Sequence, residues 1–328
     1  MSTMNAIVWT AYGSPAVLQL RTVAKPTPRD NEVLIKVHAA TVTMGDCEMR
    51  TLQFPLMYRL PLWLYIGLRK PHRITVLGQE LAGEIVAVGQ TVTRFKPGDP
   101  ILAASLFRFG AYADYLCLPE SYPIALKPAN MSYAEAATLP TGGVNGLHLL
   151  RNANVQAGDH LLINGAGGSI GTYALQLAKA KGVEVTAVDH GGKLAMIQAL
   201  GADHVIDYTQ ADFTQTGVPY DAIIDIVGKS PFGGSLRALK PKGRYVLGNP
   251  NLLAMLRGRW ATLTTDKQVR FDLADYKLED IHFLKAQAEA GTIKAVIDRA
   301  FPLAETAAAH RYVDTGQKAG NVIIMVQE

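Results

Sequence analysis

The sequence has few of the residues that build disulfide frameworks or metal-binding lobes. Cys47 and Cys117 are its only cysteines among 328 residues. Two thiols are too few for a disulfide framework or for a zinc lobe held by four thiolates. The eight histidines show no spacing typical of metal ligands. We therefore expect a chain that folds around a hydrophobic core in a reducing compartment, and we predict a cytoplasmic location.

The sequence also lacks an apolar run long enough to span a bilayer. The most lipid-like run, Phe54 to Leu68, is interrupted by Arg59 and Pro61. It falls short of the roughly 20 residues of a transmembrane helix, and the N-terminus has no signal-peptide pattern. We expect this segment to be a helical insert that packs on the fold or lines an apolar pocket, and we predict no membrane partner. The aromatic candidates for capping such a pocket are Tyr58, Trp63 and Tyr65.

Long tracts of one charge are absent as well. Lys and Arg exceed Asp and Glu by 32 − 28 = 4. The densest basic stretch, Gly67 to Arg73, is typical of a solvated loop, although it could also face a phosphate or RNA. Because no basic stripe runs along the chain, we predict no nucleic-acid partner.

The sequence contains two regions with different secondary-structure patterns, one after the other. The first 125 residues are rich in short β signals separated by Gly and Pro turns, which indicates antiparallel strands. From His160 onward, nearly continuous apolar strands alternate with helical stretches, which predicts a parallel sheet covered on both faces. The last residues, with "NVIIMVQ", again look like β-domain material. The length is about that of two domains.

The loop in "HLLINGAGGSIGTYALQLAKAKG" fits two motifs. Gly167, Ser169 and Gly171 spell GxSxG, the turn that presents a nucleophilic serine, and Asp225 with His282 or His310 could supply the acid and base on paper. A hydrolase also needs an oxyanion donor from an earlier strand of the sheet. The sequence pattern of the parallel sheet begins at this stretch, so that donor is missing and the hydrolase interpretation is disfavoured.

The alternative is a dinucleotide-binding turn, which needs a preceding strand, a following helix and an acid about 20 residues on. All three are present, because Asp189 ends the next strand 18 residues after Gly171. Ala166 stands where the strict motif has its first glycine, which weakens the signal. The predicted pyrophosphate loop consists of Gly165, Ala166, Gly167, Gly168, Ser169, Ile170 and Gly171.

Several stretches together resemble the medium-chain dehydrogenase/reductase superfamily, in particular its zinc-free quinone oxidoreductase-like branch. They are "VLIKVHAATVTMGD", "GQELAGEIVAVGQTVTRFKPGD", "GAYADYLCLP", "AATLPTGGVNG", "LINGAGGSIGTYALQLAKA", "LGADHVIDY" and "GTIKAVIDRAFPL", in family order. The resemblance implies an α/β fold with a discontinuous GroES-like β domain and a Rossmann domain with a doubly wound parallel sheet. We expect the first at residues 1–126 and 273–328 and the second at 127–272. It also implies a homodimer.

The resemblance bears on metal binding. Where zinc-dependent members place Cys, His and Cys, this sequence has Thr43, Gln79 and Thr141. Two hydroxyls and an amide would bind Zn²⁺ very weakly, and Glu80 alone cannot replace three ligands. We therefore predict no metal and assign these three residues to the substrate pocket, where they would stabilise an oxyanion. Asp46 matches a family position and is either structural or catalytic.

The resemblance also implies further cofactor contacts. Asp189 would accept hydrogen bonds from the adenosine ribose, which favours NAD(H), although Lys193 and His190 could counter the charge of a 2′-phosphate. The cofactor is thus NAD(P)(H), with a preference for NAD(H). The remaining predicted contacts are Asn145, Val227, Gly228, Gly248 and Asn249.

These observations predict an NAD(P)H-dependent reductase of quinones or other α,β-unsaturated carbonyls. Reduction of an activated double bond needs hydrogen-bond donors and positioning rather than a metal. One alternative is an alcohol or aldehyde dehydrogenase. Without a metal, such an enzyme needs a catalytic base, and no tyrosine has a lysine four positions on with which it could form a tyrosine-lysine base. The other alternative is a dinucleotide-binding protein without catalytic function, of a crystallin-like or regulatory kind.

Overall fold

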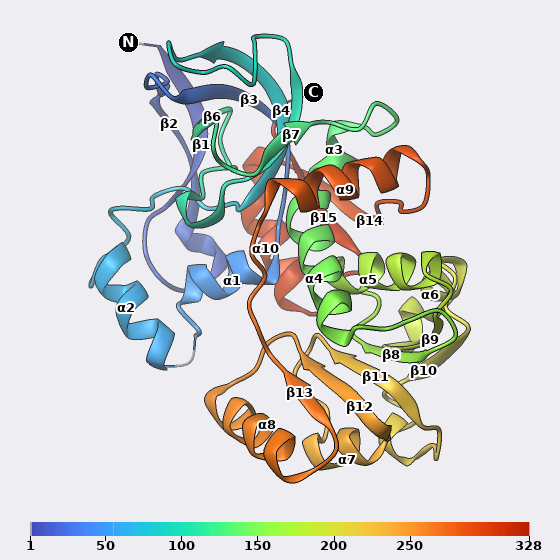
Figure 1. The fold of residues 1–328 in the computed structure, drawn as a ribbon. Coiled ribbons are helices and arrows are strands. Elements are labelled where there is room, and N and C mark those ends of the chain that lie inside the picture. Colours follow the sequence, from blue (N-terminus) through green and yellow to red (C-terminus); the bar gives the residue numbers. More distant parts are fainter. Residues whose placement is uncertain (1, 55, 328) are drawn as a thin grey trace. The chain divides into compact units, whose positions relative to one another are not determined.

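The chain folds as two compact units in the computed structural model, which describes residues 2–54 and 56–327 (Figure 1). Unit 1 comprises Met1–Thr141, Tyr276–Ala290 and Ala295–Glu328, and unit 2 comprises Gly142–Asp275 and Gly291–Lys294. The side chains of residues 56–58 are not described, so the pocket-capping role considered for Tyr58 lies outside the described residues. The domain limits expected at 126/127 and 272/273 stay a prediction.

Unit 1 is built mainly on antiparallel strands, although its C-terminal strands β14 and β15 pair in parallel. β1 (Thr3–Trp9) pairs with β2 (Leu18–Ala24), and a larger sheet has the strand order β14-β15-β3-β4-β5-β7, with β6 also on β3. C-terminal β15 pairs with β3 through Ile323 and Thr41, so the end of the chain completes the sheet that its beginning forms. The strands of the larger sheet are β3 (Glu32–Thr41), β4 (Glu80–Val88), β5 (Pro100–Ala104), β6 (Tyr115–Pro119), β7 (Ile124–Leu126), β14 (Ile297–Pro302) and β15 (Asn321–Met325).

The hydrophobic core of unit 1 lies on its larger sheet, and five α-helices complete the unit among the described residues. The buried faces of β3 and β4, with Ile35, Leu81 and Ile85, form the centre of its hydrophobic core. Most residues of β3 and the first half of β4 are buried, so both faces of this part of the sheet are covered. The helices are α1 (Met44–Thr51), α2 (Leu56–Ile66), α3 (Tyr133–Ala136), α9 (Leu278–Glu289) and α10 (Thr306–Asp314).

Unit 2 holds the predicted parallel sheet. Its strand order is β10-β9-β8-β11-β12-β13, and every neighbouring pair is parallel. Three consecutive residues of β8, Leu161 to Ile163, are fully buried, as expected for a strand covered on both faces. The strands are β8 (His160–Asn164), β9 (Glu184–Asp189), β10 (His204–Asp207), β11 (Tyr220–Asp225), β12 (Leu239–Leu247) and β13 (Gln268–Arg270).

Figure 1 shows α4 and α5 on one face of this sheet and α7 and α8 on the other. The stretch around 252–266, which has no clear sequence pattern, is a helix. The predicted fold class, a GroES-like β fold with a Rossmann sheet, is confirmed. The helices of unit 2 are α4 (Val144–Ala153), α5 (Ser169–Ala180), α6 (Leu194–Ala199), α7 (Phe232–Arg237) and α8 (Leu252–Thr264).

Candidate functional site

The glycine-rich loop connects β8 to α5 in unit 2. Gly165 has φ +89°, a left-handed conformation that a side chain would strain. A Cβ on Gly171 would overlap the carbonyl oxygen of Gly165 and lie 2.6 Å from Ala166 Cα, so only glycine lets α5 approach the loop this closely. The first turn of an α-helix has N–H groups without partners inside the helix and the positive end of the helix dipole, and both favour an anion such as a pyrophosphate.

Asp189, at the end of β9, fastens this loop to the neighbouring strand. Its side chain is nearly buried, and its Oδ2 accepts the Gly167 N–H at 2.8 Å. Oδ1 accepts the His190 N–H at 2.8 Å and pairs with Lys193 Nζ at 3.0 Å. The carboxylate that was predicted to contact the ribose therefore also organises the loop, and its charge is paired with a lysine.

The other predicted cofactor residues of unit 2 lie at the same edge of the sheet. A Cβ on Gly165 would lie 2.8 Å from a methyl carbon of Val227, and one on Gly228 would lie 2.9 Å from the carbonyl oxygen of Asn249. The Gly248 N–H donates to Asp225 O at 2.8 Å. These loops meet around β8 and β11, where the strand order reverses, which is the position of ligand sites in open parallel sheets.

Sequence reasoning missed the structural role of Asp225 in this region. The fully buried carboxylate accepts from Asn164 Nδ2 at 2.9 Å, from the Gly228 N–H at 2.9 Å and from Tyr245 Oη at 3.0 Å. Its position as the polar last residue of an apolar strand, like Asp189 in β9, was the available signal. Asp225 organises the loop after β11. Because its oxygens already accept these hydrogen bonds, the structure does not support it as the acid of a hydrolase triad.

Asn145 stands in the first turn of α4. The next residue, Gly146, packs so closely on α5 that a Cβ there would lie 3.1 Å from Ile170 O and 3.0 Å from Ala174 N. The start of α4 is thus next to the helix that follows the glycine-rich loop. The contact predicted between Asn145 and the nicotinamide is compatible with this placement and stays a prediction.

In unit 1, Thr43 and Asp46 form a capping box at the start of α1. Thr43 Oγ1 donates to Asp46 Oδ2 at 2.6 Å, and the Asp46 N–H donates back to Thr43 Oγ1 at 3.1 Å. The Gly78 N–H donates to Asp46 Oδ1 at 3.1 Å. Complete burial raises the pKa of Asp46 to about 6. Because this carboxylate accepts from the backbone N–H groups of Thr43 and Gly78, the geometry favours a structural role over a catalytic one.

Glu80, at the start of β4, is a second buried carboxyl. It accepts from the hydroxyl of Thr41, from the Thr141 N–H at 2.6 Å and from the Thr141 side chain. Only 1% of the residue is exposed, and this burial raises its pKa to about 7. Sequence reasoning considered Glu80 only as an insufficient zinc ligand, and no local pattern indicates its bond to a residue 61 positions away.

The three residues predicted for the substrate pocket lie around these two carboxyls. A Cβ on Gly45 would lie 3.2 Å from Gln79 Oε1 and 3.5 Å from Thr43 Oγ1, so both side chains border the same glycine. Gln79 is adjacent in sequence to Glu80, which Thr141 contacts. Thr43, Gln79 and Thr141 are all partly exposed, whereas Asp46 and Glu80 behind them are buried. The arrangement presents neutral hydrogen-bonding groups over a buried acidic layer.

Comparisons with known proteins agree with this architecture. Residues 29–129 match the family described as "Alcohol dehydrogenase GroES-like domain", and residues 200–324 match "Zinc-binding dehydrogenase". The chain is 32% identical to 2-methylene-furan-3-one reductase of Solanum lycopersicum, covering 98% of this chain and 79% of the relative. It is 30% identical to the chloroplastic quinone-oxidoreductase homolog of Spinacia oleracea, covering 98% of each chain.

A solved structure extends the likeness to three dimensions. The quinone oxidoreductase from Coxiella burnetii is 30% identical, with a TM-score of 0.88 over 99% of this chain and 100% of that one. The chain belongs to the medium-chain dehydrogenase/reductase superfamily, in its quinone oxidoreductase-like branch. The family resemblance predicted from the motifs is thereby confirmed, and this medium-chain reductase is an enzyme that uses NAD(P)H.

One of the matching family descriptions mentions zinc, but the side chains at the corresponding positions of this medium-chain reductase differ from typical zinc ligands. Thr43 and Thr141 offer hydroxyls and Gln79 an amide, and Zn²⁺ prefers thiolate, imidazole or carboxylate. The nearby carboxyls are already bonded to threonines and backbone N–H groups. Across residues 2–54 and 56–327, no three His, Cys, Asp or Glu side chains gather as metal ligands would. These residues do not fit a zinc ion.

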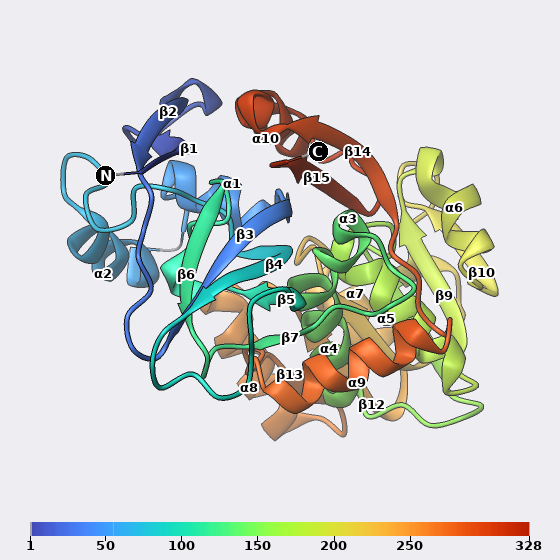
Figure 2. The same ribbon diagram turned by 90° about the horizontal axis from the view of Figure 1, so that it is seen from above.

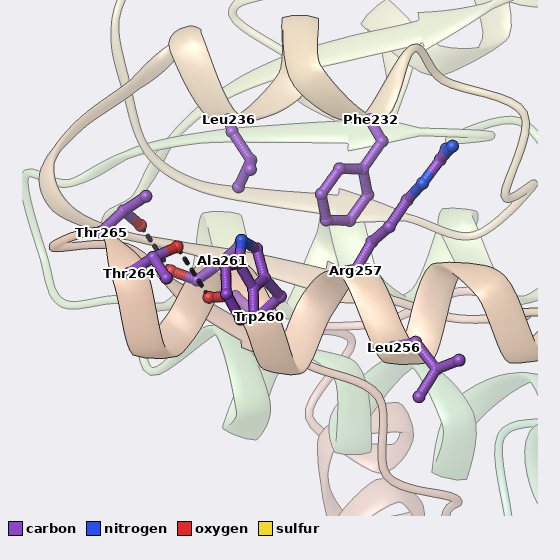
Figure 3. Close-up of a pocket in the computed structure, with 8 residues that line it drawn as sticks. All are labelled: Phe232, Leu236, Leu256, Arg257, Trp260, Ala261, Thr264 and Thr265. Atoms are coloured by element: carbon purple, nitrogen blue, oxygen red, sulfur yellow. Dashed lines mark hydrogen bonds between the residues drawn. The ribbon is translucent and has the colours of Figure 1, made fainter.

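An apolar hollow of about 440 Å³ lies elsewhere in unit 2, between α7 and α8 (Figure 3). Phe232 and Leu236 from α7 face Trp260 and Arg257 from α8 in this view. None of the residues predicted for the site lines it. A second hollow of about 300 Å³ shares Phe232 and Arg257 and includes Asp225 and Gly228, so it borders the loop after β11.

Proposed function

We propose that this medium-chain reductase transfers hydride from NAD(P)H to quinones or other α,β-unsaturated carbonyls without zinc. The observation that carries the proposal is the group of neutral polar side chains, Thr43, Gln79 and Thr141, at the family's metal positions. The names of the relatives support it, since one reduces a 2-methylene-furan-3-one and others are quinone oxidoreductases.

The residues of unit 2 fit the dinucleotide. When bound, the reduced nicotinamide supplies a hydride for the β-carbon of the substrate. Hydrogen bonds from the Gly165 and Ala166 N–H groups to Val188 O and from the Gly167 N–H to Asp189 fix the course of the loop. Gly171 keeps the start of α5 close enough for the helix dipole to act on the pyrophosphate. Asp189 and Asp225 hold the two neighbouring loops in place before any ligand arrives. This preorganisation lowers the cost of ordering the site on binding.

The residues of unit 1 fit the substrate. Negative charge develops on the carbonyl oxygen during hydride transfer, and hydrogen-bond donors stabilise it. The carboxamide of Gln79 supplies an N–H donor. The hydroxyl proton of Thr43 is already donated to Asp46, so Thr43 borders the site without donating to the substrate. The raised pKa values of Asp46 and Glu80 reduce the negative charge behind Gln79, which would otherwise oppose an enolate or hydroquinone anion.

We propose a preference for NADH over NADPH. The carboxylate of Asp189 repels a 2′-phosphate and accepts from ribose hydroxyls. Its ion pair with Lys193 reduces this repulsion, so we expect a modest preference rather than exclusion of NADPH. A homodimer and a cytoplasmic location also remain proposals drawn from the sequence.

The test is a titration of the purified protein with NADH and NADPH, followed by a panel of quinones and enones with and without a chelator. We expect turnover of at least one panel member, indifferent to the chelator. Gln79→Leu should lower kcat by roughly tenfold or more, as loss of one oxyanion donor does, with cofactor affinity unchanged. Stoichiometric zinc with alcohol-dependent reduction of NAD⁺ would instead indicate an alcohol dehydrogenase. Tight binding of NAD(P)H without turnover would indicate a non-catalytic protein.

A further inference from the structure

The insert between α1 and β4 presents an apolar surface to solvent. Leu60, Trp63, Leu64 and Tyr65 on α2 and Leu68 just after it are each between 38% and 60% exposed. Leu60 and Leu64 are one helical turn apart and therefore lie on the same side of the helix. A cluster of large apolar side chains this exposed usually marks an interaction site. The sequence-based expectation that this insert packs on the fold accounts for Ile66 and Leu62 but not for these residues.

The same segment carries only positive charge. From residue 49 to residue 79 the sequence contains no Asp or Glu, although it contains Arg50, Arg59, Arg69, Lys70 and Arg73. Arg50 is buried in an ion pair with Asp314, whereas the other four are exposed. We call the exposed set the insert surface: Arg59, Leu60, Trp63, Leu64, Tyr65, Leu68, Arg69, Lys70 and Arg73.

Contacts with unit 1 hold this surface facing outward. Ile66 is fully buried in the core, and Tyr12 Oη donates to Gly67 O at 2.5 Å. The guanidinium of Arg73 lies 5.0 Å from the ring centroid of Tyr65, which places a cation beside the exposed aromatic ring. Both views show α2 at the periphery of its unit (Figures 1 and 2). The buried Ile66 and the hydrogen bond from Tyr12 therefore fix the orientation of the insert, with its apolar side chains facing solvent.

We propose that the insert surface binds the surface of an anionic lipid bilayer. Leu, Trp and Tyr side chains flanked by Arg and Lys, with acidic residues excluded, match the composition of helices that lie in the membrane interface. The positive charges complement anionic headgroups, each contributing a roughly fivefold gain in affinity near such a surface. In the described part of the chain no helix has the length and apolarity needed to cross a membrane, so the binding is peripheral. This revises the expectation that no membrane is a partner.

A second exposed apolar helix makes the proposal specific. α8 in unit 2 exposes Leu256, Trp260 and Leu263 together with Arg257 and Arg259. Lys267 and Arg270 after it are only partly exposed, and Lys267 is paired with Asp266. The smaller number of exposed cations makes α8 the poorer match to an anionic surface. Its Leu263 and Trp260 provide controls of the same residue types that are more exposed than Leu64 and Trp63.

Vesicle co-sedimentation of the full-length protein tests the proposal. We expect binding to vesicles of phosphatidylcholine with about 30 mol% phosphatidylserine, weaker binding to phosphatidylcholine alone, and release as salt is raised. Arg69→Glu with Lys70→Glu should weaken binding by roughly tenfold or more. Leu64→Glu should weaken it as well, whereas Leu263→Glu should not. Equal loss in the α8 variant, or no binding by the wild type, would overturn the proposal.

Tryptophan fluorescence locates the contact. Trp9 is buried, so the Trp260→Phe variant reports chiefly on Trp63, and the Trp63→Phe variant on Trp260. Bilayers containing brominated phosphatidylcholine and phosphatidylserine should quench Trp63 in the first variant and leave the second unaffected. Quenching confined to Trp260 would assign the contact to α8 and contradict the proposal. Lack of wild-type binding combined with a raised KM in Leu64→Glu would assign the insert to the substrate pocket instead.

Neither measurement needs cofactor or substrate, so the membrane proposal does not rest on the proposed reductase function. A protein that binds vesicles but reduces no quinone would contradict only the function. A protein that reduces quinones but ignores vesicles would contradict only this inference.

Discussion

Replacing Glu80 by glutamine should change how the stability of unit 1 depends on pH. The Glu80 carboxyl is buried, and its partners are the hydroxyl of Thr41 and the N–H and side chain of Thr141, none of them a cation. Burial without a compensating charge raises its pKa from 4.5 to about 7. Glutamine keeps the shape of the side chain and removes the ionisation.

The sign follows from proton linkage. Between the unfolded pKa of 4.5 and the folded pKa of about 7, the folded state holds a proton that the unfolded state has lost. The free energy of unfolding therefore falls as pH rises through this window, and it reaches its full loss above the folded pKa. A shift of this size corresponds to about 3 kcal/mol, at roughly 1.4 kcal/mol per pKa unit. Below the unfolded pKa, Glu80 is protonated in both states and does not lower the free energy of unfolding.

Buried His310 acts in the opposite direction. Burial lowers its pKa to about 3, so the unfolded state binds a proton that the folded state does not, and stability rises with pH through the ordinary histidine range. The pH dependence of the wild type alone thus mixes several groups. The difference between Glu80→Gln and the wild type removes the contribution of His310, which is common to both, and reports on Glu80 together with its electrostatic coupling to Asp46.

Urea unfolding between about pH 5 and pH 8 measures this difference. In a Trp260→Phe background the fluorescence of buried Trp9 reports on unit 1. We expect the stability of Glu80→Gln relative to the wild type to improve by about 2.5 kcal/mol across this range, because part of the loss is already present at pH 5. Any constant difference caused by the changed hydrogen bonds is the same at every pH and cancels. A flat difference for Glu80→Gln would refute the reasoning.

Three further predictions concern the cofactor and metal. Gly171→Ala places a methyl group against the backbone of Gly165 and Ala166 and should weaken NADH binding by roughly tenfold or more, measured by fluorescence titration. Gly192→Ala, whose nearest contact of 3.4 Å is ordinary, should bind as the wild type does, and equal affinity of both variants would count against the loop assignment. Asp189→Ser should raise the ratio of kcat/KM for NADPH to that for NADH, and an unchanged ratio would mean that Asp189 does not face the ribose. Dialysis against a chelator should leave kcat unchanged, whereas loss of activity restored by zinc would refute the argument from the donor set.

The sequence was sufficient to predict the glycine-rich loop and its partner Asp189. Both belong to one continuous strand, loop, helix and strand, so the spacing along the chain determines the spacing in the fold. The Gly167 to Asp189 hydrogen bond follows from this local unit. The return of the C-terminus to the first sheet was predicted only through the family resemblance, since nothing local to β15 indicates that it pairs with β3.

The buried carboxyls were harder to predict because their environment is made by distant residues. Glu80 reads as an ordinary charged strand residue until Thr41 and Thr141 close over it. The insert shows the converse difficulty, since an apolar helix has the same pattern whether its apolar residues are buried or exposed. The short apolar run indicated a helical insert but not the exposure of Leu60 and Leu64.

The most direct measurement of the proposed reaction uses NADH carrying deuterium at C4 and an enone as acceptor. Mass spectrometry and NMR of the product show where the deuterium has gone. We expect one deuterium at the former β-carbon and an intact carbonyl group. Deuterium on the carbonyl carbon of an alcohol product, or no transfer to any quinone or enone, would contradict the account.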